Sequence, residues 1–344
     1  MRAMVLHDPR ETGGRVSITG EEADVPSFGD DEVLIQVSAC AVCRTDLDIG
    51  EGRLVAHHYP IIPGHQVVGR IAAIGTAVTT RKIGDRVGLA WIHRACGRCQ
   101  WCSTGQENLC PYFESTGCTA NGGYAEFVVA PATFTHEIPS GLSDAEAAPL
   151  LCAGAIGWRS LRLAKLTDRD PLGFTGFGAS AHLVLQIAKQ RYPRSPLYVF
   201  ARSDSERAFA RELGATWAGD TADEPPSPLA AIIDTTPAWK PVIEALRRLM
   251  AGGRLVINAI RKSSADRDEL ARIDYARDLW MEREIKSVAN VTRDDVREML
   301  DAASVLGVRP TVEEMPLEDA SRALERLRTG RSLRGAMVLR VAKG

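Results

Sequence analysis

Four cysteines, Cys96, Cys99, Cys102 and Cys110, lie close together in this chain. Their spacing is C-x2-C-x2-C-x7-C, so one short loop can bring four soft ligands around a single ion. Four thiolates on one loop favour a closed, structural zinc site. The alternatives are an iron–sulfur cluster, two disulfides or four unrelated buried thiols. Pro111 follows the last cysteine, but the segment lacks the x3 spacing of bacterial ferredoxins.

Three further residues are candidates for a second metal site. Cys43 lies in Cys-Arg-Thr-Asp-Leu, His65 in Pro-Gly-His and Cys152 in Pro-Leu-Leu-Cys-Ala-Gly. Taken singly, each is equally well explained by packing, as a core thiol, a turn histidine and a thiol at the start of a helix. Taken together, three ligands with an open fourth position are typical of a catalytic zinc site. Cys40 and Cys118 are interpreted as ordinary buried thiols.

A glycine-containing loop predicts a dinucleotide site. Gly176-Phe177-Gly178-Ala179-Ser-Ala181 has the pattern G-x-G-x-x-A, follows a predicted strand and opens a predicted helix. Gly176 permits a tight turn, Gly178 lets the backbone approach a pyrophosphate, and Ala181 allows close packing of the helix on the strand. The N-terminus of the helix offers free N–H groups and a positive dipole to the phosphates. A glycine-rich turn in a non-binding α/β fold is the alternative.

The end of the next predicted strand bears on cofactor choice. An NAD site usually carries an acid there for the ribose hydroxyls, but this chain has Ala201 followed by Arg202 and Ser203. Loss of the acid removes repulsion against a 2′-phosphate, and arginine supplies a permanently charged, planar partner. We therefore expect NADP(H) in preference to NAD(H). Two alternatives remain, a displaced acid at Asp204 and an arginine that is only solvated.

The elements that must position these residues fall into two groups. The chain has 344 residues, which suits two domains. Residues 1–150 are rich in short β-type runs, whereas strands alternate with helices from residue 172, which predicts a doubly wound parallel sheet. We expect a β-rich domain from residues 1–152 and 290–344, and a dinucleotide-binding domain from residues 153–289. The predicted strands are 33–39, 67–74, 172–176, 197–201, 230–234, 254–258 and 335–341. The predicted helices are 145–163, 179–190, 205–213, 239–250, 293–306 and 317–329.

The composition excludes several classes of protein. The chain is 45% hydrophobic and 25% charged, with a net charge of −2, so neither nucleic acid nor an acidic membrane surface is expected as a partner. It has neither a signal-peptide pattern nor a continuous apolar run of about 18 residues. Eight cysteines without a secretion signal favour metal or thiol chemistry over disulfides. A cytoplasmic location is the expectation.

Over essentially its whole length the chain resembles the zinc-dependent medium-chain alcohol dehydrogenases. The resemblance rests on motifs in the family's order, and the nearest branch is that of the bacterial cinnamyl-alcohol-dehydrogenase-like aldehyde reductases. It implies an α/β protein with a β-rich GroES-like catalytic domain and a Rossmann domain. The matching motifs are Gly64-His65-Gln66-Val-Val-Gly69, Gly84-Asp-Arg-Val87, the four-cysteine lobe, Gly122-Gly123-Tyr124-Ala-Glu126, Leu-Leu-Cys152-Ala-Gly and Gly-Phe-Gly-Ala-Ser-Ala-His.

The resemblance also implies roles for individual residues. Cys43, His65 and Cys152 would bind a catalytic zinc, and the lobe a structural one. Thr45 matches the hydroxyl residue that hydrogen-bonds the alkoxide, and Asp46 the carboxylate that orients the ligand histidine. The residues that match pyrophosphate contacts are Arg44 and Arg334, for which exposed surface arginines are the alternative.

Two positions depart from the family pattern. The relay histidine is replaced by Asp48, so the proton must leave through Asp48, water or the ribose hydroxyl. The usual glutamate after the ligand histidine is Gln66, a neutral residue that should leave the zinc site less negative. Neither change removes a metal ligand.

The resemblance implies hydride transfer between NADP(H) and a primary alcohol or aldehyde, by a homodimer or homotetramer. Trp91 and Phe113, with side chains near Ile49 and Asn290, are expected to line the substrate pocket and favour medium-chain or aromatic substrates, with core packing as the alternative. Because the relay histidine is missing, reduction of a C=C or C=N bond is a second hypothesis. A non-catalytic NADPH-binding protein of the same fold is a third.

Overall fold

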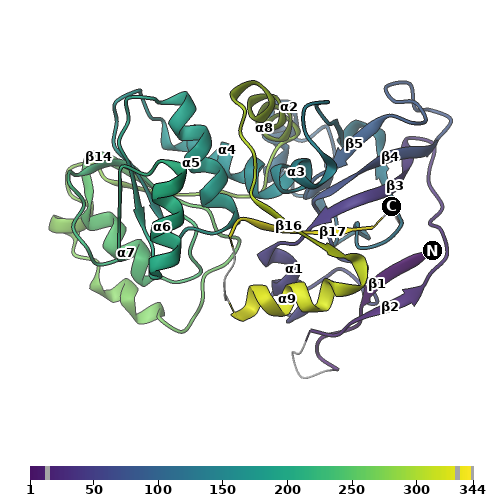
Figure 1. Cartoon of the computed structure of the whole chain (residues 1–344), viewed down its shortest axis with the longest axis horizontal. Helices are drawn as coiled ribbons and strands as arrows, with labels where there is room; N and C mark the ends of the chain where they lie inside the picture. Colours follow the sequence, from purple (N-terminus) through teal and green to yellow (C-terminus); the bar gives the residue numbers. More distant parts are fainter. Residues whose placement is uncertain (12–15, 330–333, 342–344) are drawn as a thin grey trace. The chain divides into compact units, whose positions relative to one another are not determined.

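The computed structural model describes residues 1–11, 16–329 and 334–341, and these divide into two compact units. The first unit comprises Met1–Ala155, Asn290–Ser304 and Arg309–Gly344, and the second comprises Ile156–Ala289 and Val305–Val308. The first unit is therefore assembled from the two ends of the chain, whereas the second comes mainly from its middle (Figure 1).

The first unit is built on a largely antiparallel sheet with the order β16-β17-β3-β4-β5-β9, in which β8 also pairs with β3. Val33, Ile35 and Val37 lie on one buried face of the central strand β3, while the other face is exposed at Gln36 and buried towards both ends of the strand. The strands are β3 Glu32–Ala41, β4 Val67–Ile74, β5 Arg86–Leu89, β8 Phe127–Pro131, β9 Thr135–Glu137, β16 Val312–Pro316 and β17 Ala336–Arg340. The predicted β-rich character of this part is confirmed.

Short elements surround this sheet. Two hairpin-like pairs join β1 Arg2–Leu6 to β2 Ile18–Glu22 and β6 Ile92–Arg94 to β7 Glu114–Ser115. Helix α9, which follows a 3-10 turn at Leu317–Asp319, packs beside α1. The helices are α1 Arg44–Gly50, α2 Gln100–Ser103, α3 Asp144–Pro149, α8 Arg293–Leu306 and α9 Ala320–Thr329, and 3-10 turns occupy Glu107–Leu109 and Ala132–Phe134.

A change of helical pitch occurs at Cys152. Helix α3 ends at Pro149, a π-helical turn spans Leu150–Gly154, and α4 continues as Ala155–Ala164. Proline has no N–H to continue the regular hydrogen-bond ladder, and π-turns within helices are frequent at functional sites. The predicted helical segment 145–163 is confirmed, and the π-turn sets the direction in which Cys152 points.

The second unit contains, in its described residues, a six-stranded parallel sheet with the order β12-β11-β10-β13-β14-β15. The strand order reverses between β10 and β13, and ligands of open α/β sheets bind beyond the carboxyl ends of the strands at such a reversal. The strands are β10 Leu172–Thr175, β11 Leu197–Phe200, β12 Trp217–Gly219, β13 Leu229–Asp234, β14 Leu249–Ile257 and β15 Glu284–Ser287. The predicted Rossmann-type sheet is confirmed.

The helices of the second unit agree with the prediction except at one boundary. They are α5 Ala179–Arg191, α6 Asp204–Leu213 and α7 Lys240–Arg247, with short helical turns at Arg267–Arg272 and Tyr275–Leu279. The predicted helix 239–250 is too long, because Leu249 already pairs with Leu229 in the sheet and Gly252 has a left-handed φ of 71°. Within the described residues, no helix has the length and apolar composition needed to span a membrane.

Candidate metal centres and dinucleotide site

The four-cysteine lobe has the geometry of a tetrahedral metal site. Cys99 Sγ lies 3.6 Å from Cys102 Sγ and 3.9 Å from Cys110 Sγ, and Cys96 Sγ lies 3.9 Å from Cys102 Sγ. Zinc–sulfur bonds of about 2.3 Å in a tetrahedron place sulfurs about 3.8 Å apart, whereas a disulfide requires about 2.05 Å. All four thiols are free. The donor set and its spacing therefore fit zinc, and the disulfide alternative is wrong.

Backbone N–H groups already favour thiolate at one of these positions. Hydrogen bonds from the backbone of Arg98 and Cys99 lower the pKa of Cys96 to about 6. Burial, with a hydrogen bond to Cys99, raises the pKa of Cys102 to about 12. A divalent cation would neutralise the accumulated negative charge and allow all four thiolates to form together.

The three-residue cluster is also assembled, from three separate segments of the first unit. The ligand atoms of Cys43, His65 and Cys152 lie within 4.8 Å of one another, and His65 Nε2 is 3.3 Å from Cys152 Sγ. Cys43 precedes α1, His65 precedes β4 and Cys152 lies in the π-turn. Two sulfurs and one imidazole nitrogen are a soft donor set that suits zinc and leaves a fourth coordination position open.

A buried carboxylate fixes the orientation of the histidine. Asp46 and His65 are both fully buried, and Asp46 Oδ1 lies 2.9 Å from His65 Nδ1. Asp46 also accepts a hydrogen bond from the backbone N–H of Cys43 at 2.8 Å. Burial opposes a charged imidazole, but Asp46 and Cys43 outweigh it and raise the pKa of His65 to about 10. The carboxylate therefore holds the proton on Nδ1 and directs Nε2 towards the two sulfurs.

The two thiols of this cluster differ in proton affinity. A hydrogen bond from Cys152, partly opposed by burial, lowers the pKa of Cys43, and the nearby His65 charge adds to this effect. The same hydrogen bond and burial raise the pKa of Cys152. Cys43 is thus the readier thiolate of the pair.

Of the remaining predicted catalytic residues, Thr45 lies next to the three-residue cluster, whereas Asp48 is hydrogen-bonded to Arg53. Thr45 Oγ1 is 3.7 Å from Cys43 Sγ. Asp48 is buried, and its Oδ1 accepts a hydrogen bond from Arg53 Nε at 2.6 Å. Gln66 is buried as well, and its Oε1 accepts a hydrogen bond from the backbone N–H of Ala153 at 3.5 Å.

An aromatic residue and an asparagine lie against the histidine ligand. The Trp91 ring makes an edge contact with His65, with a centroid separation of 5.0 Å, and its Nε1 donates to Asn290 Oδ1 at 3.0 Å. Asn290 has a φ of 52°, a left-handed conformation that asparagine tolerates better than most residues. Ile49 is fully buried in the hydrophobic core, against which Phe113 also packs. Core packing therefore accounts for the burial of Ile49.

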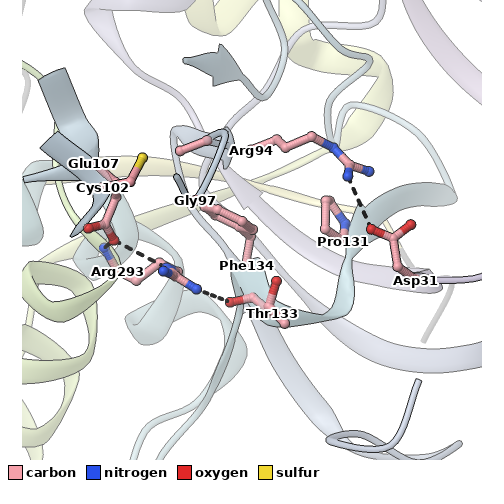
Figure 2. A pocket seen from close by; sticks show the side chains of 10 residues that line it. Asp31, Arg94, Gly97, Cys102, Glu107, Pro131, Thr133, Phe134 and Arg293 are labelled. Atoms are coloured by element: carbon pink, nitrogen blue, oxygen red, sulfur yellow. Dashed lines mark hydrogen bonds and ion pairs between the residues drawn. The ribbon is translucent and has the colours of Figure 1, made fainter. Parts of the chain in front are cut away.

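A pocket of about 290 Å³ lies beside the four-cysteine lobe, and Cys102 is one of its lining residues (Figure 2). Arg293 Nε donates to Glu107 Oε1 at 3.1 Å, and its guanidinium carbon lies 4.6 Å from the centre of the Phe134 ring. Arg94 is paired with Asp31 at 3.1 Å. Since its arginines are matched by carboxylates, we interpret the pocket as a support that ties the lobe to the start of α8.

The predicted phosphate loop has the expected backbone. Gly176 has a φ of 78°, and Gly178 is the N-cap of α5. A Cβ on Gly178 would project into open space, so no described protein atom requires glycine there, and the loop fits close approach by a pyrophosphate. Ala179 and Ala181 lie in the first turn of α5, where Ala181 is buried. The Phe177 side chain is buried against Phe209.

Two arginines lie near the end of β11, the exposed Arg202 and the partly buried Arg207. Arg202 is exposed, and the Ser203 hydroxyl caps α6 by accepting the backbone N–H of Glu206 at 3.2 Å. The sequence pattern did not single out Arg207, which donates to the backbone oxygens of Ala201 at 2.6 Å and Arg202 at 3.0 Å. These bonds fix the turn that carries Arg202. The other two predicted cofactor residues, Arg44 and Arg334, are both exposed residues of the first unit.

Comparison with known proteins agrees with this geometry. Residues 29–140 match the alcohol dehydrogenase GroES-like domain. The chain is 43% identical to a probable alcohol dehydrogenase AdhA of Mycobacterium tuberculosis over 336 residues, covering 96% of this chain and 94% of that protein. A cinnamyl alcohol dehydrogenase of Sorghum bicolor has a TM-score of 0.84 at 27% identity, with 100% and 98% of the two chains covered. A cinnamyl alcohol dehydrogenase of Helicobacter pylori complexed with NADP(H) has a TM-score of 0.86 at 22% identity over the full length of both chains.

The fold and the two cysteine clusters thus define a two-domain dehydrogenase of the zinc type. The chain belongs to the zinc-dependent medium-chain alcohol dehydrogenase family.

Proposed function

We propose that this protein is a zinc-dependent alcohol dehydrogenase or aldehyde reductase that transfers hydride between NADP(H) and a primary alcohol or aldehyde. The observation that carries the proposal is the cluster of Cys43, His65 and Cys152, with the buried His65 hydrogen-bonded to Asp46 at 2.9 Å. Three ligands with an open position distinguish a catalytic zinc from a structural one. The four-cysteine lobe would hold a second, structural zinc.

The chain's own residues would position the reactants and transfer the proton to or from the substrate oxygen. When bound, zinc would supply Lewis-acid polarisation of the substrate oxygen, and the reduced nicotinamide would supply the hydride. We propose that the hydroxyl of Thr45, which lies 3.7 Å from Cys43 Sγ, would exchange a proton with that oxygen. The proton would then leave through Asp48, water or the ribose hydroxyl, and a route through Asp48 would compete with the hydrogen bond that its carboxylate accepts from Arg53.

Preference for NADP(H) is supported by the turn after β11. Ala201 stands where an NAD site usually carries an acid, and the exposed Arg202 and Ser203 follow it. Arg207 holds the backbone of this turn through two hydrogen bonds. We propose that the loop of Gly176–Ala181 receives the pyrophosphate, and that Arg44 and Arg334 contribute further positive charge to it.

Medium-chain and aromatic aldehydes are the substrates that we propose. Trp91 is the aromatic side chain in contact with the ligand His65, and Asn290 fixes its indole ring. A flat aromatic ring close to the proposed metal site would favour extended or planar substrates. We also propose a homodimer or homotetramer. The edge strand β15 is exposed along its whole length, and the nearby Trp280 is 56% exposed. Light scattering of the purified protein tests the assembly directly.

The deciding experiment measures zinc content together with NADPH and NADH oxidation in the presence of an aromatic aldehyde. About two zinc ions per chain, with faster turnover of NADPH, is the expected result. One zinc and no turnover would leave only the lobe filled, and would favour a non-catalytic NADPH-binding protein. With an enal as substrate, formation of the saturated aldehyde instead of the alcohol would favour the C=C reductase alternative.

A further inference from the structure

The segment Gly122-Gly123-Tyr124 packs against the segment that leads to the ligand His65. The backbone N–H of Gly123 donates to Gly64 O at 2.9 Å, and that of Tyr124 donates to Pro63 O at 3.0 Å. A Cβ on Gly122 would overlap Gly64 O, so this segment can approach the neighbouring backbone only without a side chain. The two segments therefore lie against one another immediately before His65.

The tyrosine of this segment reaches the carboxylate behind the histidine. Tyr124 is fully buried, and its hydroxyl donates to Asp46 Oδ2 at 3.1 Å. Its ring also packs on Gly64, where a Cβ would collide with the ring carbons. A single side chain thus contacts both the residue preceding the ligand and the carboxylate that orients the ligand.

The hydrogen bonds of Asp46 leave little freedom in its carboxylate. Oδ1 contacts His65 Nδ1 at 2.9 Å, while Oδ2 accepts from Cys43 N at 2.8 Å and from Tyr124 at 3.1 Å. Two of the three contacts connect to metal-ligand residues, and only the tyrosine comes from outside the cluster. Removing the tyrosine hydroxyl would leave Oδ2 with the backbone bond alone, and the carboxylate could rotate away from the imidazole.

We propose that Tyr124 is a positioning residue for the catalytic metal, which acts through Asp46 to hold His65 in its coordinating orientation. This inference rests on the proposed catalytic zinc site. The tyrosine hydroxyl contacts the carboxylate that orients the histidine, and not a ligand atom. Its effect should therefore appear first in metal retention, because outer partners of a ligand histidine typically change metal affinity by about 10- to 100-fold.

The test compares zinc release from wild-type protein and from Tyr124→Phe, with a colorimetric chelator in excess. One of the two zinc ions should leave about 10-fold faster or more from the variant. The zinc of the four-cysteine lobe should leave at its wild-type rate, which provides an internal control. In cobalt-substituted protein, the visible absorption bands of the catalytic site should change in Tyr124→Phe.

Tyr198→Phe is a matched control, because Tyr198 is a buried tyrosine of the second unit whose hydroxyl lies 3.1 Å from Ser227 Oγ. It should leave both release rates unchanged. In an Asp46→Ala background, adding Tyr124→Phe should cause no further acceleration, since the tyrosine acts through that side chain. Unaltered release and an unaltered cobalt spectrum in Tyr124→Phe would overturn the inference. A wild-type protein that binds only the lobe zinc would overturn the proposed function itself, and the inference with it.

Discussion

Lys262 donates from its ammonium group to the carboxylate of Asp234, which is fully buried at the carboxyl end of β13. Nζ also donates to the backbone oxygens of Thr236 at 2.7 Å and Ala238 at 3.2 Å. On the other side, Asp234 Oδ1 accepts from the hydroxyl of Thr175 at 2.6 Å, at the end of β10. Asp234 therefore links the ends of β13 and β10, the two strands between which the sheet order reverses, and Thr175 immediately precedes Gly176 of the phosphate loop.

Lys262→Met should destabilise the protein by about 3–5 kcal/mol, because it leaves Asp234 as an uncompensated buried charge. The double variant with Asp234→Asn should recover much of that loss, since both charges are then absent. Urea denaturation followed by tryptophan fluorescence gives the comparison. Lys240→Met, at an exposed lysine of the same unit, is the control and should change stability by less than about 0.5 kcal/mol. A loss in the double variant as large as in the single one would show that the charge is not the cause.

Thr45→Ala should lower turnover by about 100-fold or more, the usual scale for a positioned acid–base group. Thr45→Ser keeps the hydroxyl and should retain most of the activity. Steady-state kinetics with an aldehyde and NADPH measure both variants, and zinc analysis verifies that each still carries its metal. Turnover at the wild-type level in Thr45→Ala would remove this residue from the mechanism.

Arg202→Ala should reduce the ratio of kcat/KM for NADPH to that for NADH by roughly 10- to 100-fold. A hydrogen bond from a charged donor contributes about 1.5–3 kcal/mol, and about 1.4 kcal/mol corresponds to a factor of ten. The loss should fall on the KM for NADPH, because the 2′-phosphate lies far from the reacting atoms. Arg267→Ala alters another exposed arginine of the second unit and should leave the ratio unchanged. An equal loss with both cofactors would point to a general effect on the fold.

Removing one ligand from each cluster should show that one zinc is needed for activity and the other for stability. Cys152→Ser should lose about one zinc and the activity while thermal unfolding changes little, because that site is built on a fold that other contacts maintain. Cys99→Ser should also lose about one zinc but should lower the unfolding temperature, since a closed four-thiolate site contributes folding energy. Zinc analysis and differential scanning calorimetry provide the two readouts. Equal thermal stability of the two variants would contradict the assignment.

Stability should fall in mild acid because of a buried neutral histidine. Burial, aided by Arg81, lowers the pKa of His136 to about 3, against 6.5 for an exposed imidazole. Below pH 6.5 the unfolded chain binds a proton that the folded protein rejects, so stability is full above pH 6.5 and declines as pH falls towards 3. The decline from this group approaches about 1.4 kcal/mol per pH unit.

His136→Gln should remove that contribution, so its unfolding free energy should depend less steeply on pH between 6.5 and 5 than that of the wild type. Denaturation curves at several pH values measure the difference. His57→Gln, at an exposed histidine, should keep the wild-type slope. Identical slopes for wild type and His136→Gln would show that His136 does not titrate differently in the two states.

The sequence by itself determined the features that depend on local spacing. The four cysteines at 96–110 form one loop, so their separation along the chain already prescribes their closeness in space. The strand and helix periodicities predicted both sheet types, and the glycine loop was recognised because a strand precedes it and a helix follows. Even here one boundary was missed, since the pairing of Leu249 with Leu229 ends α7 at Arg247.

Only the tertiary structure decided which distant residues meet. Cys43, His65 and Cys152 are brought together by three separate elements, and their local patterns are equally compatible with packing. Three side-chain contacts join segments that are far apart in the sequence and that the hydrophobic periodicity does not connect. They are Tyr124 with Asp46, Asn290 with Trp91 and Lys262 with Asp234. Periodicity specifies which face of an element is buried, but the partner across that face is fixed only when the whole core packs.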